Sequence, residues 1–600
     1  MFKKILYLYF FSITFFTYSQ EKELFPLQTK DSLAQQKWVD SIMDNMSIDE
    51  KIGQLFMVQA YSNKGAKHYN AIENLIEKYH IGGLIFMQGT ALKQAQLTNK
   101  YQSISKTPLL IGLDAEWGLN MRLKNTFKFP WNMTLGAIRD NQLIEQFGKQ
   151  LAQQCRRIGV NINFAPVVDI NINPENPIIG NRSFGENRDN VTNKASAFIK
   201  GLQSENVLAC AKHFPGHGDT ASDSHTSLPV LNFNRNRLDS IELYPYKNLV
   251  KTNLASVMVA HLSVKALEPE INLPTSLSYN VVTNLLQNQL NFKGLIITDA
   301  LNMKGASNFA KPGELELDAF LAGNDILLFP EDVKSAITNI KKAVSDSLVS
   351  EERLNYSVKK ILKAKYWAGL NNYHYINVDN LQNDIHTNAN DLLNRKLVQN
   401  SITLLKNKQG ILPIQKLETK KIAYVKLGDA SNTSFVKMLQ NYAKVDVVSS
   451  NNLDDLITKL KPYNLVIIGF HKSNINPWKS YKFTNKELVW LHEIARTNKV
   501  ILDVFASPYS LLQIKTFENI EGLLMSYQNS TIAQELSAQA IFGGIDVKGK
   551  LPVSIRNEFD EGYGIWSTSL KRLAYSIPED VNLSSVKLKQ IDSVANEVIK

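Results

Sequence analysis

The stretch VLACAKHFPGHGDTASDSH, residues 207–225, changes abruptly from apolar to polar, and this change indicates both a fold and a chemistry. Its first five residues, Val207 to Ala211, form a short apolar run of the kind that becomes a buried strand. The loop that follows, Lys212 to His225, holds three histidines, two aspartates, a lysine and two glycines. Side chains that exchange protons near neutral pH therefore come directly after a predicted strand.

Asp223 and His225 are the strongest candidates for acid–base chemistry in this loop. Two residues apart, the carboxylate can accept a hydrogen bond from one imidazole nitrogen and leave the other nitrogen facing a substrate. A purely structural role in turns or helix capping is the main alternative. Zinc binding fits less well, because the spacings match no usual ligand pattern and the loop has no cysteine. We therefore expect neither a metal nor another cofactor.

Short apolar runs of the same kind recur along the first 330 residues, with segments of helical spacing between them. The eight predicted strands are 53–58, 82–87, 108–113, 160–168, 207–211, 256–260, 294–298 and 325–329. The clearest helical segments are 141–158, 191–204 and 314–322. Strands that alternate with helices predict a parallel sheet buried on both faces, and eight such units predict a (β/α)8 barrel. An open, doubly wound sheet is the alternative.

The barrel prediction places function at the C-terminal ends of the strands. Side chains capable of chemistry follow five of the predicted strands. They are Asp114 with Glu116 and Trp117, Asp169, Lys212 with His213, His261, and Asp299. Five such coincidences are hard to assign to chance, so we expect one shared site at this end of the barrel.

A second alternating region follows a polar segment that is typical of a linker. It predicts a smaller α/β/α sandwich of ordinary domain size, with strands at 422–427, 445–449, 465–470, 500–505 and 522–526. The chain then ends in an amphipathic segment, which either packs as a terminal helix or is the first helix of a further domain, since it resembles the opening helix of a serine-hydrolase domain. We therefore divide the chain into a signal peptide (1–19), a catalytic barrel (20–370), a linker (371–390), a sandwich (391–570) and a C-terminal segment (571–600).

The N-terminus has the pattern of a secretory signal peptide. Lys3 and Lys4 precede an apolar stretch, 5–16, and small residues follow it. We expect cleavage after Ser19 and export to the periplasm or the extracellular space. The stretch is short for a membrane anchor, and no later segment is long and apolar enough to span a bilayer.

The charge balance and the two cysteines exclude other classes. Lys and Arg number 67 against 56 for Asp and Glu, and the excess is spread along the sequence without a basic block. Nothing in this pattern indicates a nucleic-acid partner. Cys155 falls in a predicted helix and Cys210 in a predicted strand, so we expect buried thiols rather than a disulfide framework.

The loop KHFPGHGDT…DSH, together with ITDALNM at 297–303, resembles glycoside hydrolase family 3. The branch that it resembles is the bacterial β-N-acetylglucosaminidases of cell-wall turnover. Further matches lie at 112–122, 181–185, 400–407 and 549–552, so the resemblance covers roughly residues 40 to 560.

This resemblance implies a retaining mechanism in two steps. Asp299 is the implied nucleophile that forms a glycosyl-enzyme, and His225, held by Asp223, is the implied acid and base. Most retaining enzymes use two carboxyl groups for this work, whereas an imidazole suits proton transfer near neutrality. The residues that it implies for binding sugar hydroxyls are Asp114, Arg122, Arg182, Lys212 and His213. Capping of the following helix is the structural alternative for Asp299.

The sequence departs from that branch in one place. Many members carry Glu-Gly-Gly after the first aspartate, whereas this chain has Glu116-Trp117-Gly118, which resembles the β-glucosidase side of the family. The expected activity is an exo-β-N-acetylglucosaminidase that releases terminal β-linked N-acetylglucosamine from peptidoglycan fragments. A β-glucosidase or β-xylosidase, a glycoside phosphorylase and a non-catalytic binding protein are the alternatives.

Overall fold

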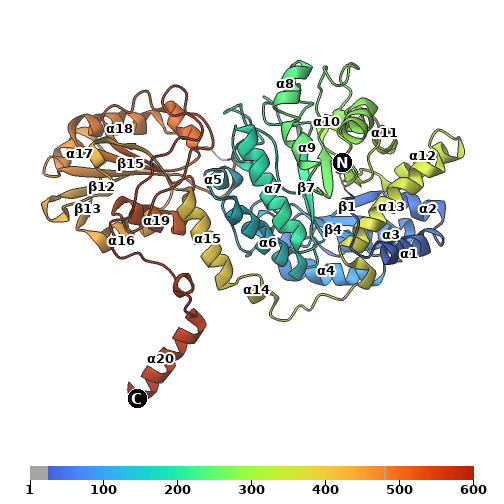
Figure 1. Ribbon diagram of the computed structural model, residues 1–600, viewed down its shortest axis with the longest axis horizontal. Coiled ribbons are helices and arrows are strands. Elements are labelled where there is room, and N and C mark those ends of the chain that lie inside the picture. Colours follow the sequence, from blue (N-terminus) through green and yellow to red (C-terminus); the bar gives the residue numbers. More distant parts are fainter. Residues whose placement is uncertain (1–24, 479–480, 600) are drawn as a thin grey trace, which may run out of the picture.

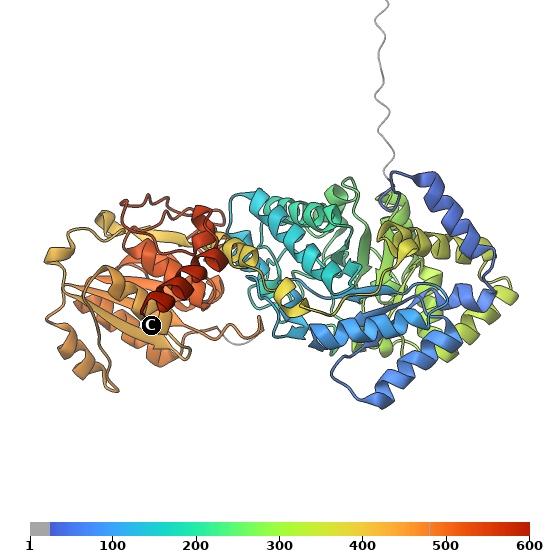
Figure 2. The same ribbon diagram turned by 90° about the horizontal axis from the view of Figure 1, so that it is seen from below.

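The computed structural model describes residues 25–478 and 481–599. They form two α/β bodies that lie side by side, as two perpendicular views show (Figures 1 and 2). The first body carries the chain from blue to yellow-green in these views, and the second from yellow to red. The predicted signal peptide, 1–19, lies outside the described residues.

An eight-stranded parallel sheet forms the centre of the first body, in the order β10-β1-β2-β4-β6-β7-β8-β9. Its strands are β1 (Phe56–Ala60), β2 (Gly83–Phe86), β4 (Leu110–Leu113), β6 (Ile162–Asn163), β7 (Leu208–Phe214), β8 (Ser256–Val259), β9 (Leu295–Thr298) and β10 (Leu327–Leu328). A parallel bridge between Ile297 and Ile326 joins β9 to the residue before β10 and brings the sheet close to full closure. The predicted (β/α)8 barrel is confirmed, and each predicted run supplies one strand.

The first strand begins later than predicted. Ile48–Gly53 forms helix α2, whose N-terminus carries a capping box between Ser47 and Glu50. This capping box agrees with the sequence pattern of a helix start. Because the helix extends through Gly53, the strand can begin only at Phe56.

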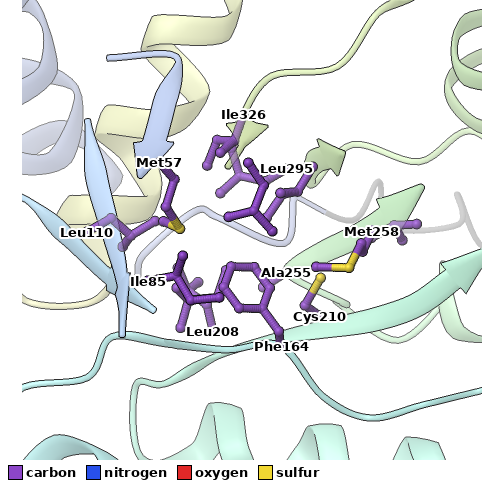
Figure 3. Close-up of a cluster of buried hydrophobic side chains, with 14 of the residues drawn as sticks. Met57, Ile85, Leu110, Phe164, Leu208, Cys210, Ala255, Met258, Leu295 and Ile326 are labelled. Carbon is purple, nitrogen blue, oxygen red and sulfur yellow. The ribbon is translucent and has the colours of Figure 1, made fainter. Parts of the chain in front are cut away.

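Apolar side chains fill the inside of the barrel. Figure 3 shows Met57, Ile85, Leu110, Phe164 and Leu295 among those that meet at its centre. Four of them lie on the different strands β1, β2, β4 and β9, and Phe164 directly follows β6, so several strands fill the interior as in other parallel barrels. Cys210 lies in this cluster, and it and Cys155 are buried free thiols, as expected.

Helices surround the barrel. They are α1 (Ser32–Met43), α2 (Ile48–Gly53), α3 (Ala66–Tyr79), α4 (Ala91–Ser103), α5 (Asn132–Gly136), α6 (Asn141–Arg157), α7 (Arg188–Ser204), α8 (Arg235–Ser240), α9 (Tyr244–Leu249), a π-helix (Asn280–Gln289), α10 (Lys304–Ser307), α11 (Glu314–Ala322), α12 (Val333–Ser345) and α13 (Glu351–Trp367). Helices α6 and α7 approach very closely at Gly148 and Gly201. A Cβ on Gly201 would come within 2.1 Å of the Glu145 carbonyl oxygen, so only glycine fits there.

The second body is built on a six-stranded sheet in the order β11-β16-β15-β14-β12-β13. Its strands are β11 (Thr403–Asn407), β12 (Ile422–Gly428), β13 (Val445–Val447), β14 (Leu465–His471), β15 (Val500–Phe505) and β16 (Ile520–Met525). The helices packed around them are α15 (Asn388–Ser401), α16 (Thr433–Tyr442), α17 (Leu453–Leu460), α18 (Asn485–Thr497) and α19 (Thr531–Ile541). All five predicted strands are present. The edge strand β11 was not predicted, because Lys406 and Asn407 cut its apolar run short.

Two further helices remain. Helix α14 (Leu381–Asp384) is a single turn within the segment that joins the two bodies, and its Leu381 is buried in the core of the barrel body. Helix α20 (Ser585–Ile599) projects away from the sandwich, and none of its residues is buried (Figure 1). Among the helices of the described residues, none is long and apolar enough to cross a membrane.

Candidate active site

A cavity of about 430 Å³ opens at the C-terminal ends of the barrel strands. Seven of the eight residues expected at the site line it. They are Asp114, Arg122, Arg182, His213, Asp223, His225 and Asp299. The strand ends thus bring together residues from positions 114 to 299 of the chain, as the barrel prediction requires.

The eighth residue, Lys212, lies beneath the cavity and is not among its lining residues. Its ammonium group contacts Asp114 Oδ1 at 2.8 Å and Glu116 Oε1 at 3.0 Å. Glu116 in turn accepts two hydrogen bonds from Arg182, at 2.7 Å to Oε1 and 3.0 Å to Oε2. Arg122 holds the second oxygen of Asp114. Two carboxylates and three cations therefore form one connected network.

The network keeps Asp114, Glu116 and Lys212 charged. Burial alone would raise the pKa of Glu116, but Arg182 and Lys212 lower it to about 2. Burial likewise opposes ionisation of Asp114, yet Lys212 and Arg122 hold its pKa well below the usual range. Burial would lower the pKa of Lys212, but the two carboxylates raise it. Rigid charged groups at the cavity wall suit the binding of hydroxyl groups.

The carboxylate of Asp169 fixes the position of the His213 ring. Its Nδ1 lies 2.7 Å from Asp169 Oδ2, and the backbone N–H of His217 donates to Asp169 Oδ1 at 2.7 Å. The rings of His213 and His217 lie edge to face. Burial and the nearby His213 lower the pKa of His217 to about 4, so its ring is neutral at neutral pH. His217 bonds to Thr220 and Ser224 and thus fixes the loop internally.

Asp223 and His225 form the predicted pair. Nδ1 of His225 lies 2.7 Å from Asp223 Oδ1, and the same oxygen accepts the backbone N–H of His225 at 2.9 Å. Within the described residues, Nε2 of His225 has no hydrogen-bond partner. The imidazole is 58% exposed, so this second nitrogen is free to meet a substrate.

Asp299 follows β9 and lies near the imidazoles of His213 and His261, which affect its pKa. Burial acts to raise its pKa, but His213, His261 and the Ala300 N–H, which donates to Oδ1 at 2.8 Å, lower it below the ordinary value. Helix α10 begins only at Lys304 and is capped by Met303, so Asp299 is not its N-cap. The carboxylate is therefore ionised and free of a capping role.

The loop that carries the pair is anchored in its first half. A Cβ on Gly218 would lie 1.9 Å from the carbonyl oxygen of Ile170, and one on Gly216 would lie 2.7 Å from Glu242. These two glycines allow the loop to pack closely against the rest of the barrel. Asp219, in the same half of the loop, forms an ion pair with Arg237 at 2.9 Å. The more exposed second half of the loop, 221–227, carries the acid–base pair.

The sandwich also contributes to the cavity. Trp478, in the loop after β14, is one of its lining residues. Its indole N–H donates to the Ile178 carbonyl at 3.1 Å, and its ring meets Trp117 edge to face at 6.3 Å. The second body therefore helps to shape the site, a contribution for which the sequence offers no local signal.

Glu116 and Asp169 lie at the strand ends where the sequence placed them, although no catalytic or sugar-binding role was assigned to either. Trp478 was not predicted, because it comes from another sheet. A group of three or more His, Cys, Asp or Glu side chains arranged to hold a metal ion does not occur in the described residues.

Comparisons with known proteins agree with this geometry. The family model described as glycosyl hydrolase family 3 N terminal domain matches residues 47–364. The chain is 31% identical over 427 residues to β-hexosaminidase A of Pseudoalteromonas piscicida, which covers 66% of this chain and 69% of the relative. It is 27% identical over 385 residues to the β-N-acetylglucosaminidase/β-glucosidase of Cellulomonas fimi, covering 63% and 68%.

Among solved structures, a family 3 β-N-acetylglucosaminidase from Paenibacillus sp. str. FPU-7 superposes with a TM-score of 0.70 at 27% identity. The match covers 85% of this chain and 99% of that one, so it includes the sandwich as well as the barrel. With the family model spanning more than half of the sequence, the barrel, its cavity and the comparisons lead to one conclusion: this chain belongs to glycoside hydrolase family 3 and is a glycoside hydrolase.

Proposed function

We propose that this protein is a retaining exo-β-N-acetylglucosaminidase that hydrolyses terminal β-linked N-acetylglucosamine from peptidoglycan fragments. One observation carries the proposal: the Asp223–His225 pair and Asp299 line the same cavity. A proton donor steadied by a carboxylate and a separate ionised carboxylate are the two groups that a retaining mechanism needs.

In the first step, a carboxylate oxygen of Asp299 attacks the anomeric carbon and forms a glycosyl ester. The bond between that carbon and the leaving oxygen breaks, and the oxygen takes the proton from Nε2 of the His225 imidazolium. Asp223 stabilises the charged imidazolium before the transfer and keeps Nε2 directed away from itself. The lowered pKa of Asp299 keeps the nucleophile ionised.

In the second step, the neutral His225 accepts a proton at Nε2 from a water molecule. The water oxygen bonds to the anomeric carbon, and the ester bond to Asp299 breaks. The sugar leaves with its original configuration, and both groups regain their starting protonation states. Asp114, Arg122, Arg182 and His213 hold the sugar hydroxyls during both steps.

The names of similar proteins support the sugar assignment. The Pseudoalteromonas relative is a β-hexosaminidase, whereas the Cellulomonas relative combines N-acetylglucosaminidase and glucosidase activities in its name. Trp117 resembles the β-glucosidase side of the family. The sugar assignment therefore depends on comparing activity on N-acetylglucosaminides with activity on glucosides.

A side-by-side assay tests the proposal. We expect nitrophenyl β-N-acetylglucosaminide to be cleaved with a kcat/KM at least tenfold above those of the glucoside and xyloside. The released sugar should keep its β configuration in a proton NMR time course. Activity on the glucoside or xyloside alone would overturn the acetamido assignment. Release of a sugar 1-phosphate in added phosphate would identify a phosphorylase.

Activity on the natural substrate class is a separate test. Purified peptidoglycan fragments with a non-reducing N-acetylglucosamine end should lose that sugar, as detected by mass spectrometry. Fragments that end in another sugar serve as the control and should remain intact. Equal, negligible turnover by the wild type and by Asp299→Ala would favour a binding protein.

We further propose that the protein is exported and processed after Ser19. The support is the order of lysines, apolar stretch and small residues at the N-terminus. N-terminal sequencing of the protein recovered from its native host should begin at Gln20. A first residue of Met1 would contradict export by this route.

A further inference from the structure

A second cavity, of about 310 Å³, lies in the sandwich at the end away from the barrel. Asn464 and Lys499 of its lining come directly before β14 and β15, and Lys420 lies two residues before β12. Trp478, which reaches the catalytic cavity, instead follows the opposite end of β14. Seven residues of β14 separate the two ends, a distance of roughly 20 Å along the strand.

This cavity is strongly cationic. Its charged lining residues are four lysines and one glutamate: Lys408, Lys416, Lys420, Lys499 and Glu521. Lys408, Lys416 and Lys420 lie in the segment between β11 and β12, and the fold adds Lys499, which is 79 positions beyond Lys420. The lining carries a net charge of +3, counted from these five groups.

The positive charge is poorly neutralised. Lys408 pairs with Glu521 at 3.2 Å. Within residues 25–478 and 481–599, the ammonium groups of Lys416, Lys420 and Lys499 have no ion-pair or hydrogen-bond partner. Like charges that share a concave surface repel one another, and an anion in their midst relieves this repulsion.

The backbone of the loop between β11 and β12 also has unusual geometry at this cavity. Gln409 and Lys416 have φ angles of 53° and 51°, in the left-handed region that side-chain-bearing residues adopt rarely. The side chains of Gln409 and Gln415 add amide donors to the lining. The cavity therefore offers several cations and neutral donors, with one carboxylate already engaged by Lys408.

We propose that this lysine cavity binds a multiply charged phosphate group. Phosphate concentrates more negative charge than a carboxylate, and its oxygens accept hydrogen bonds from several ammonium groups at once. The group is supplied either by a soluble phosphate compound or by a phospholipid headgroup. The site is separate from the glycosidase chemistry, so its failure would leave the proposed activity untouched.

The test uses the full chain and two triple variants. In the site variant, Lys416→Gln, Lys420→Gln and Lys499→Gln remove the three unpaired charges. In the control variant, Lys437→Gln, Lys587→Gln and Lys589→Gln remove three exposed charges outside the cavity. Both variants change the net charge equally, so a difference between them reports the cavity and not the overall charge.

Pyrophosphate binding, measured by isothermal titration calorimetry, is the first arm. We expect the site variant to raise the Kd at least tenfold and the control variant to change it less than twofold. Wild-type affinity should also fall as salt rises from 50 to 300 mM, because small ions screen exposed charges. Turnover of a nitrophenyl glycoside should be the same in all three proteins.

Vesicle flotation is the second arm and identifies the source of the phosphate. Binding to phosphatidylglycerol vesicles but not to phosphatidylcholine vesicles, lost in the site variant alone, would assign a lipid headgroup. Pyrophosphate binding without vesicle binding would assign a soluble phosphate. Absence of both, or equal losses in the two variants, would overturn the proposal.

Discussion

The barrel and the sandwich both place titratable side chains near the C-terminal ends of parallel strands, but these side chains meet different surroundings. In the barrel, Asp114 and Asp299 lie at the wall of a cavity. In the sandwich, His471 at the end of β14 is buried between Tyr424 and Asn529 and stacks on Phe505 at 4.4 Å. A titratable residue at the C-terminal end of a strand therefore does not by itself form a functional site.

Asp503 of the sandwich and two carboxyl groups of the barrel site have pKa values that are shifted in opposite directions. Burial raises the pKa of Asp503 in β15 to about 7, and the hydrogen bonds from the hydroxyls of Ser526 and Ser537 offset this rise only in part. In the barrel, nearby imidazoles and cations overcome burial and keep Asp114 and Asp299 ionised. Neighbouring positive charge, more than position in the fold, decides which carboxylate is ready to act.

Removal of the Asp299 carboxylate should have the largest effect. Asp299→Asn keeps the shape of the side chain but abolishes the nucleophile, so we expect kcat to fall by about 10⁴-fold or more. The circular dichroism spectrum and the Tm should stay close to wild type. A variant that retains a tenth of the activity would remove Asp299 from the mechanism.

Glu116→Gln should damage the barrel network most. The change leaves Arg182 and Lys212 buried with one negative charge fewer, and breaking a buried ion pair costs about 3–5 kcal/mol. We expect a clearly lower calorimetric Tm for the barrel and a higher KM. Glu145→Gln, at an exposed ion pair with Lys200, is the control and should change the Tm little.

His225→Ala should slow turnover by about 10²–10⁴-fold. The loss should be much smaller with a dinitrophenyl glycoside, whose leaving group needs no proton. Asp223→Asn should show the same dependence on leaving group, with a smaller loss. Equal losses on good and poor leaving groups would indicate that His225 does not protonate the departing oxygen.

Asp503→Asn should stabilise the protein, whereas mutation of a buried polar group usually destabilises one. The folded-state pKa of about 7 lies above the ordinary 3.8, so the carboxyl destabilises the fold as pH rises through this window. We expect the variant to gain stability relative to wild type by about 4 kcal/mol between pH 4 and pH 8. Calorimetric Tm values at both pH values check this, and a constant difference would contradict it.

Trp478→Ala should have the smallest effect. Loss of an aromatic wall that the sandwich adds to the cavity should raise KM for an oligosaccharide about five-fold, with kcat nearly unchanged. Trp566→Ala, at a 65% exposed tryptophan outside the cavity, is the matched control. Identical kinetics in both variants would show that the barrel binds substrate alone.

The sequence predicted the barrel well because each buried strand is a short apolar run that ends in a polar residue. It also predicted the residues that now line the cavity, since Asp114, His213 and Asp299 stand where such runs end. It could not predict Trp478, because contact between two sheets depends on packing that no local pattern encodes. The lysine cavity was not predicted either, because the sequence does not show that Lys499 joins the lysines between β11 and β12.

Covalent trapping identifies the nucleophile. The protein would be incubated with a slow fluorinated β-N-acetylglucosaminide, digested with a protease and analysed by mass spectrometry. We expect one sugar adduct, on the peptide that contains Asp299, and its absence in Asp299→Asn. An adduct on any other carboxylate would show that Asp299 is not the nucleophile.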